Sequence, residues 1–317
     1  MRPDSRRVRL LQATVLPLLA LVLGACAGTE ANVSTRESDA LGVLIMAHGG
    51  DAAWNQSVLQ AVEPLKRKRP LEVAFGMARP DTLQAAVQAL EERGVRRIVV
   101  VRLFVSGKSF RERTEQILGL EPGASPRPSG MTMASGDGHG HHMMPPWRIE
   151  TSSTFSLSRE GLAESDLMNE ILMARARALS RDPSRESVLV LAHGPGDDEE
   201  NREWLANLER RVEPMRRTMG FRRVAVETLR EDWPERRREA ERRIRGFVAQ
   251  ASRDGGRAIV IPFRVQGFGP YAEVLEGLDY VSDGKGLLPH PNVIAWIEDQ
   301  IDRCAARGFE APLSPAN

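Results

Sequence analysis

Unbroken apolar runs of strand length recur along the chain and predict strands that are buried on both faces of a parallel sheet. Between them, apolar residues recur at helical spacing. The predicted strands cover residues 41–47, 71–75, 97–105, 148–155, 188–192, 224–227 and 258–261, and the predicted helices cover residues 52–66, 80–93, 162–179, 197–217, 234–250 and 292–307. This alternation is typical of an α/β protein with right-handed crossovers.

The order of these elements occurs twice along the chain. Each half begins with an apolar strand that ends in Ala-His-Gly. It continues through a helix, a strand and a helix that begins at a proline, and then reaches a strand followed by a glycine motif. We therefore predict an α/β fold of two duplicated lobes, residues 41–186 and 187–312, each a parallel sheet flanked by helices.

The two Ala-His-Gly tripeptides place His48 and His193 at the carboxyl ends of central strands. Open α/β sheets bind their ligands at this edge, and the following glycines allow the chain to turn sharply. The same position also suits a histidine that only caps its strand by a hydrogen bond to the backbone. The repetition of the tripeptide in the same local setting favours a shared ligand site.

The N-terminal segment is typical of an export signal rather than of a folded element. Four arginines precede an apolar stretch over residues 10–23, which ends in Leu-Gly-Ala-Cys. This tetrapeptide resembles the lipobox of bacterial lipoproteins, which implies cleavage before Cys26, lipidation of that cysteine and a tether over residues 27–40. A plain signal peptide or an uncleaved anchor are the alternatives. We expect an extracytoplasmic protein, lipid-anchored to a bacterial membrane on its periplasmic side.

The composition of the chain bears on its fold class and on the partners that it can bind. The chain is 41% hydrophobic and 27% charged, with a net charge of +1, which is the balance of a globular protein and gives no indication of nucleic-acid binding. Its 2 cysteines exclude a disulfide framework.

Residues 119–146 differ from their surroundings, because Gly, Pro, Ser and Met dominate and no periodicity is present. We predict a long flexible insertion in the first lobe. It contains His139, His141 and His142 beside two methionines, and imidazole and thioether ligands suit nickel, copper, zinc or cobalt. The alternative is a low-complexity loop without a metal-binding role.

Together, the two Ala-His-Gly strand ends, the following Asn55 and Asn201, and the strands that end in glycine motifs resemble the sirohydrochlorin cobaltochelatase and ferrochelatase group, the CbiX-type class II chelatases. Residues 286–291 are also similar to the segment that opens the last helix of that group. The resemblance implies two chelatase-like lobes and a divalent metal ion, whether cobalt, nickel, iron or zinc. It also implies a tetrapyrrole or another small-molecule metal ligand as partner.

In that family, the first-strand histidine binds the metal, a second histidine follows the third strand, and an acidic residue follows the second strand. This chain departs from the pattern, since Ser109 stands where the second histidine would be and Met77 stands at the acidic position of the first lobe. The second lobe offers Glu231 and Glu273. The resemblance thus implies His193, His48 and Glu231 as catalytic residues, and His48, His193, Glu231 and Glu273 as candidate metal ligands. The composition of the insertion adds His139, His141 and His142 as candidate metal ligands.

Three hypotheses follow. The chain inserts Co²⁺, Ni²⁺ or Fe²⁺ into a tetrapyrrole such as sirohydrochlorin, with a neutral imidazole holding the metal and a base taking the pyrrole protons. Alternatively, it is a lipid-anchored extracytoplasmic metal-binding protein in which catalysis is reduced or lost. A small-molecule binding module without metal is the third class. The retained Ala-His-Gly turns favour the first hypothesis, while the missing second histidine and the export signal favour the second.

Overall fold

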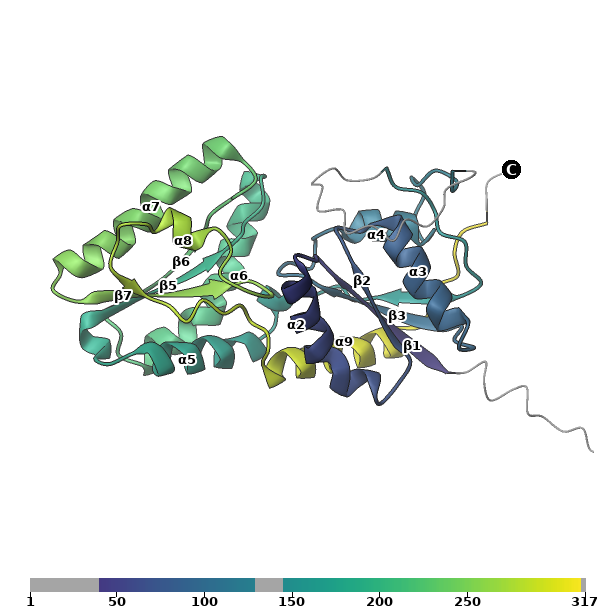
Figure 1. Cartoon of the computed structure of the whole chain (residues 1–317), viewed down its shortest axis with the longest axis horizontal. Coiled ribbons are helices and arrows are strands. Elements are labelled where there is room, and N and C mark those ends of the chain that lie inside the picture. Colours follow the sequence, from purple (N-terminus) through teal and green to yellow (C-terminus); the bar gives the residue numbers. More distant parts are fainter. Residues whose placement is uncertain (1–39, 129–144, 315–317) are drawn as a thin grey trace, which may run out of the picture. The chain divides into compact units, whose positions relative to one another are not determined.

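The computed structural model describes residues 40–128 and 145–314. Within them lie two four-stranded, fully parallel sheets (Figure 1). Their strand orders, β2-β1-β3-β4 and β6-β5-β7-β8, have the same topology, in which the Ala-His-Gly strand lies between the next two strands of its half. The predicted α/β fold of two duplicated lobes is therefore confirmed.

The first sheet consists of short buried strands linked by helices. Its elements are β1 (Leu41–Ala47), α2 (Ala52–Lys66), β2 (Leu71–Phe75), α3 (Pro80–Glu91), β3 (Arg97–Leu103), α4 (Arg111–Ile117) and β4 (Thr154–Leu157). Asp51 caps α2 by accepting a hydrogen bond from the Trp54 N–H at 2.7 Å, and Pro80 begins α3, where its missing N–H costs nothing.

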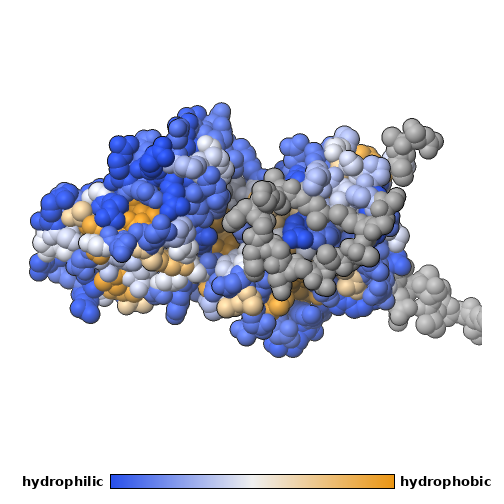
Figure 2. All heavy atoms as spheres, turned by 45° about the horizontal axis from the view of Figure 1, so that its top comes forward, coloured by the Kyte–Doolittle hydropathy of each residue, from blue (hydrophilic) through white to orange (hydrophobic). Residues whose placement is uncertain are grey.

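The second sheet follows the same plan. Its elements are α5 (Leu167–Leu179), β5 (Glu186–Ala192), α6 (Asp198–Thr218), β6 (Arg223–Thr228), α7 (Pro234–Arg253), β7 (Arg257–Phe263), α8 (Tyr271–Val274), β8 (Tyr280–Val281) and α9 (Pro291–Arg307). The His290 ring caps α9 by accepting a hydrogen bond from the Asn292 N–H at 3.1 Å. Figure 2 shows the hydrophilic surface of this lobe around α7, whose Arg237–Glu241 and Arg243–Glu239 ion pairs face solvent.

Each sheet is covered by helices on both faces, and the two lobes exchange one helix. On the first sheet, α3 and α4 cover one face, while α2 and α9 cover the other. On the second sheet, α7 and α8 cover one face, while α5 and α6 cover the other. The predicted boundary between residues 186 and 187 falls after the first residue of β5, and α5 and α9 each lie against the sheet on the other side of that boundary.

Two predicted elements differ in extent. The strand expected over residues 148–155 is only Thr154–Leu157, because the Glu91 carboxylate accepts hydrogen bonds from the Thr151 hydroxyl, the Ser152 N–H and the Ser153 hydroxyl and holds this stretch in an irregular loop. The helix expected over residues 162–179 is divided into a 3₁₀ turn at Leu162–Glu164 and α5.

Several predictions fall on other parts of the chain. Cys26, the tether up to residue 39, and His139, His141 and His142 lie outside the described residues. The described ends of the predicted insertion pack on the first lobe, since Ser125 pairs with Trp147, and the Trp147 ring is buried beneath the Arg127 guanidinium. Among the helices that the structure describes, none has the length and apolar character needed to cross a bilayer.

Candidate metal site

The two Ala-His-Gly turns meet at one cavity. His48 follows β1 and His193 follows β5, and both side chains line a cavity of about 510 Å³. Each histidine is followed by a glycine with a left-handed backbone, at φ +81° for Gly49 and +80° for Gly194. A Cβ on Gly194 would lie 2.5 Å from the Thr228 Cβ, so this turn requires glycine for space as well as for conformation.

The cavity walls come from both lobes and include five aromatic side chains. The aromatic residues that line the cavity are Trp54, Phe104, Phe110, Trp204 and Trp233. The Trp233 ring lies near the His193 ring, with 6.1 Å between ring centroids. Apolar aromatic side chains with polar groups between them are typical of small-molecule sites, and such rings can stack on a planar ligand.

The His193 ring is held between two carboxylates that follow β6. Its Nε2 lies 3.0 Å from Asp232 Oδ2 and 3.7 Å from Glu231 Oε1. Burial of the ring by itself lowers the pKa of His193, but the hydrogen bond to Asp232 and the charges of Glu231 and Asp232 outweigh it, so the net pKa is raised above its ordinary value. His193 can hold a proton in this arrangement, and it must lose that proton to solvent before its ring nitrogen can bind a cation.

Asp232 is a site residue that the sequence analysis missed. Its carboxylate lines the cavity and is the closer of the two to His193. Glu231 instead accepts two hydrogen bonds from Arg264, at 2.8 and 3.0 Å, and is not among the residues that line the cavity. Glu231 therefore supports the His193 ring from behind, while Asp232 faces the ligand space. Because the two acids are adjacent in sequence, no pattern distinguishes them before the loop geometry is known.

Glu273 is not brought to the histidines. Its side chain is 76% exposed, lies outside the residues that line the cavity, and is 3.7 Å from Arg237 of α7. The prediction that Glu273 belongs with His193 was based on its sequence distance from the glycine motif at Gly267, and the turn into α8 directs it elsewhere. Glu273 is an exposed surface carboxylate.

His48 has a different environment from His193. It is exposed, and its Nδ1 lies 2.8 Å from the Gly49 carbonyl oxygen. A ring Nδ1–H that donates to a backbone carbonyl leaves Nε2 available as an acceptor, which is the common arrangement of metal-binding histidines. The backbone contact that a merely capping histidine would make is therefore present, but the ring still lines the cavity.

The loop after β3 contributes Lys108 and Ser109 to the cavity. A buried guanidinium holds this loop in place, because Arg102 donates to the carbonyl oxygens of Gly107 at 2.8 Å and Ser109 at 2.9 Å. Burial lowers the pKa of Arg102 to about 10, so it stays charged at neutral pH. Lys108 itself forms an ion pair with Glu203 of α6 at 2.5 Å.

The cavity offers two imidazoles rather than a complete set of metal ligands. Among residues 40–128 and 145–314, no group of three or more His, Cys, Asp and Glu side chains is placed to hold a metal ion. His48, His193 and Asp232 all line the cavity, and imidazole nitrogens and carboxylate oxygens are donors that divalent ions accept.

The comparisons with known proteins agree with this fold. The CbiX family model matches residues 42–116, which lie in the first lobe. SirB from Bacillus subtilis, solved with Fe³⁺, aligns with a TM-score of 0.57 at 13% identity over 84% of this chain and 96% of that one. The sirohydrochlorin chelatase SirB from Bacillus subtilis subspecies spizizenii, in complex with cobalt, aligns with a TM-score of 0.54 at 11% identity over 85% and 99%.

A protein from Deinococcus radiodurans, described as multi-domain with structural similarity to chelatases and two additional novel domains, aligns with a TM-score of 0.51 at 19% identity over 86% of this chain and 56% of its own length. The comparison with curated protein sequences finds no match. The fold is that of two chelatase-like α/β lobes. The match to the CbiX family model is confined to the first lobe.

Proposed function

We propose that the chain binds a divalent metal ion through His48 and His193 and inserts it into a tetrapyrrole such as sirohydrochlorin. One observation carries this proposal: the imidazoles of both lobes line the same aromatic-walled cavity. The metal is a substrate in this reaction, with cobalt, nickel or iron as the candidates. The histidines would hold it while the macrocycle lies against the tryptophan and phenylalanine side chains.

The chemistry requires proton transfer as well as metal binding. Insertion of M²⁺ into a macrocycle displaces two pyrrole protons, so the site needs groups that accept them. Neutral His193 binds the metal or takes a proton, and Asp232, 3.0 Å away, stabilises the imidazolium that forms. Two protein ligands leave the remaining metal positions open to pyrrole nitrogens, which allows the ion to leave the protein.

Absorbance changes on mixing the purified protein with Co²⁺ and sirohydrochlorin test the proposal. We expect insertion faster than the uncatalysed rate, and a loss of about a hundredfold or more in His193→Ala and His48→Ala, because general acid–base and metal-holding groups each contribute at this level. His290→Ala is the matched control, since this histidine caps α9 outside the cavity. No acceleration over buffer would exclude the enzymatic proposal.

A second candidate is a metal-binding protein with reduced catalysis. Ser109 lines the cavity at the position of the missing second histidine, which favours this alternative. It predicts that Co²⁺ binds and that His48→Ala and His193→Ala weaken this binding, while the macrocycle is not metallated. A deletion of residues 139–142 separates the histidine-rich segment from the cavity, because metal binding that is lost only with this deletion would not belong to the lobes.

We also propose that Cys26 anchors the chain to a membrane on the periplasmic side. The support is the lipobox-like Leu-Gly-Ala-Cys after a basic and apolar leader. Cys26→Ser is expected to move the protein from the membrane fraction to the soluble fraction of cells and to abolish incorporation of radiolabelled fatty acid. Retention of Cys26→Ser in the membrane fraction would rule out this anchor.

A further inference from the structure

We propose that Arg230 is a positioning residue, which fixes the His193 turn and the Asp232 loop to one another so that His193 is preorganised for its metal. This inference deepens the proposed function and rests on it. Arg230 lies in the loop between β6 and α7, and it is not among the residues that line the cavity. It acts on the ligand only through the turn that it holds.

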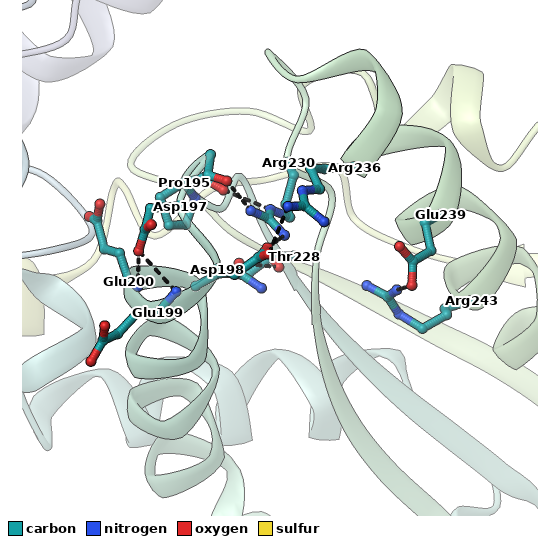
Figure 3. A network of polar contacts seen from close by, with 12 residues as sticks. Pro195, Asp197, Asp198, Glu199, Glu200, Thr228, Arg230, Arg236, Glu239 and Arg243 are labelled. Atoms are coloured by element: carbon teal, nitrogen blue, oxygen red, sulfur yellow. Dashed lines mark hydrogen bonds and ion pairs between the residues drawn. The ribbon is translucent and has the colours of Figure 1, made fainter.

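The Arg230 guanidinium makes three contacts with the His193 turn, residues 195–198, which follow that histidine (Figure 3). Its Nε donates to the Pro195 carbonyl oxygen at 2.8 Å, its Nη2 donates to the Gly196 carbonyl oxygen, and its Nη1 pairs with Asp198 at 2.6 Å. Only 8% of the side chain is exposed. The planar fork of an arginine can make such contacts with a fixed geometry, whereas a lysine presents one point charge.

The backbone of Arg230 makes a fourth contact. Its N–H donates to the His193 carbonyl oxygen at 2.5 Å, and its φ of +56° lies in the left-handed region that residues other than glycine rarely adopt. The two following residues are Glu231 and Asp232, whose carboxylates flank the His193 ring. The unusual backbone at Arg230 therefore directs both acids toward the histidine, and the guanidinium contacts hold this conformation.

The first lobe is built differently at the corresponding place. Its His48 turn is held by the Asn55 side chain, which accepts a hydrogen bond from the Gly50 N–H at 3.0 Å. In the loop after β2, Arg79 pairs with Asp81 of its own helix at 2.5 Å. The second lobe uses its equivalent asparagine, Asn201, to accept a hydrogen bond from the Thr228 hydroxyl at 2.7 Å. The Arg230 contacts are thus a feature of the second lobe, in which the histidine ring, that of His193, is half-buried.

A simpler role for Arg230 would be charge neutralisation of Asp198. The neighbouring Arg236 provides the comparison, because its guanidinium pairs with the other oxygen of Asp198 at 2.7 Å (Figure 3) and its side chain is 49% exposed. If neutralisation of Asp198 were what mattered, the two arginines would be interchangeable. If instead the Arg230 contacts to the backbone carbonyl oxygens position His193, only substitution of Arg230 changes the affinity for the metal.

The experiment compares Arg230→Met, Arg230→Lys and Arg236→Met in the full chain, with Co²⁺ as the probe. Trp233 fluorescence reports binding, because its ring is 6.1 Å from His193 and Co²⁺ quenches nearby indoles. A Trp233→Phe variant identifies the part of the signal that comes from this residue. We expect Arg230→Met to weaken binding at least tenfold, Arg230→Lys to weaken it about threefold to tenfold because lysine cannot form the fork, and Arg236→Met to change it less than twofold.

Thermal unfolding of each variant separates positioning from stability. A lower melting temperature in Arg230→Met or Arg230→Lys with unchanged Co²⁺ affinity would overturn the inference and leave Arg230 a purely structural residue. If Arg230→Met fails to fold, Arg230→Lys decides by the same criterion. His193→Ala distinguishes the two proposals: unchanged affinity there contradicts the proposed function, while weakened affinity there with normal affinity in both Arg230 variants contradicts only the inference about Arg230.

Discussion

At the scale of single residues, the difference between the two histidines depends on their neighbours rather than on their own position. Both follow a central strand, but His193 has Asp232 at 3.0 Å while His48 faces the Gly49 carbonyl oxygen. A carboxylate beside an imidazole favours the protonated ring, which must lose its proton before a metal can bind. Metal binding at His193 therefore competes with a proton that the neighbouring carboxylates help to hold.

Asp232→Asn tests this dependence. The pKa of His193 is raised, so Co²⁺ affinity should fall as pH drops through a value above that of an ordinary histidine. Removal of the Asp232 hydrogen bond and charge leaves burial, which lowers the pKa, less opposed, and the midpoint of Co²⁺ binding should move to lower pH. Histidine NMR resonances followed against pH give the same shift directly. Asp279→Asn, on an exposed residue outside the cavity, serves as the control.

The same pair of residues makes a stability contribution of defined sign. Protonated His193 gains its partner only in the folded chain, so this stabilisation is fully present below the pKa of histidine in the unfolded chain and is lost as pH rises through the raised folded value. If the pH midpoint of Co²⁺ binding is the same in Asp232→Asn as in the unaltered protein, the neighbouring Glu231, rather than Asp232, raises the pKa of His193.

The two histidines could be predicted from the sequence, but Asp232, the carboxylate closest to His193, could not. A strand that ends in Ala-His-Gly fixes where His48 and His193 lie, because the ends of parallel strands meet at one edge of the sheet. The loop after β6 has no such constraint. Its path depends on the left-handed backbone of Arg230 and on the Glu231–Arg264 pair, which bring together residues that are distant in sequence. Such contacts leave no periodic pattern to recognise.

At the scale of elements, the predicted strands and helices are largely those of the structure, since buried parallel strands and proline-started helices have strong local signals. The failures have tertiary causes. The strand around β4 begins late because Glu91, the last residue of α3, binds the Thr151–Ser153 segment. The loop after β3 is shaped by the Arg102 guanidinium, a charged residue inside an otherwise apolar strand.

Arg102 also shows why the glycine motifs of the two lobes differ in structure. Fully buried, it donates to the Gly107, Ser109 and Ser158 carbonyl oxygens and fixes the loop that carries Lys108. In the second lobe, Arg264 comes one position after β7, stays partly exposed, and pairs with Glu231. The first arginine organises a loop of the cavity wall, while the second supports the acid behind His193. Two arginines near equivalent strand ends thus have separate roles.

At the scale of the whole molecule, the exchange of α5 and α9 makes the two lobes depend on each other. The α9 residues Trp296, Ile297 and Ile301 are buried in the same apolar cluster as Val99 and Val101 of β3. The amphipathic patterns of both helices were recognised in the sequence, but a pattern shows only that a helix has an apolar face. It does not show which sheet that face covers, so the sequence alone predicts that each helix packs on the sheet of the half of the chain in which it occurs.

Two fragments test this dependence. Residues 41–186 correspond to the first lobe as the sequence delimits it, and they contain α5 but lack α9. Residues 41–165 joined through a Gly/Ser linker to residues 289–313 replace α5 with α9. We expect the second fragment to be monomeric in gel filtration and to unfold in urea in one cooperative transition, because α9 covers the face of β3 that the first fragment exposes.

The expected size of the effect follows from one residue. Trp296 is fully buried in that cluster, and truncation of a buried tryptophan to alanine costs about 3–5 kcal/mol. Trp296→Ala in the α9-containing fragment should therefore remove a large part of the stability of a small domain, which is about 5–15 kcal/mol in total. A first fragment that is monomeric and as stable as the second would mean that α5 replaces α9 on the first sheet, and that the exchanged arrangement is not needed to complete the lobe.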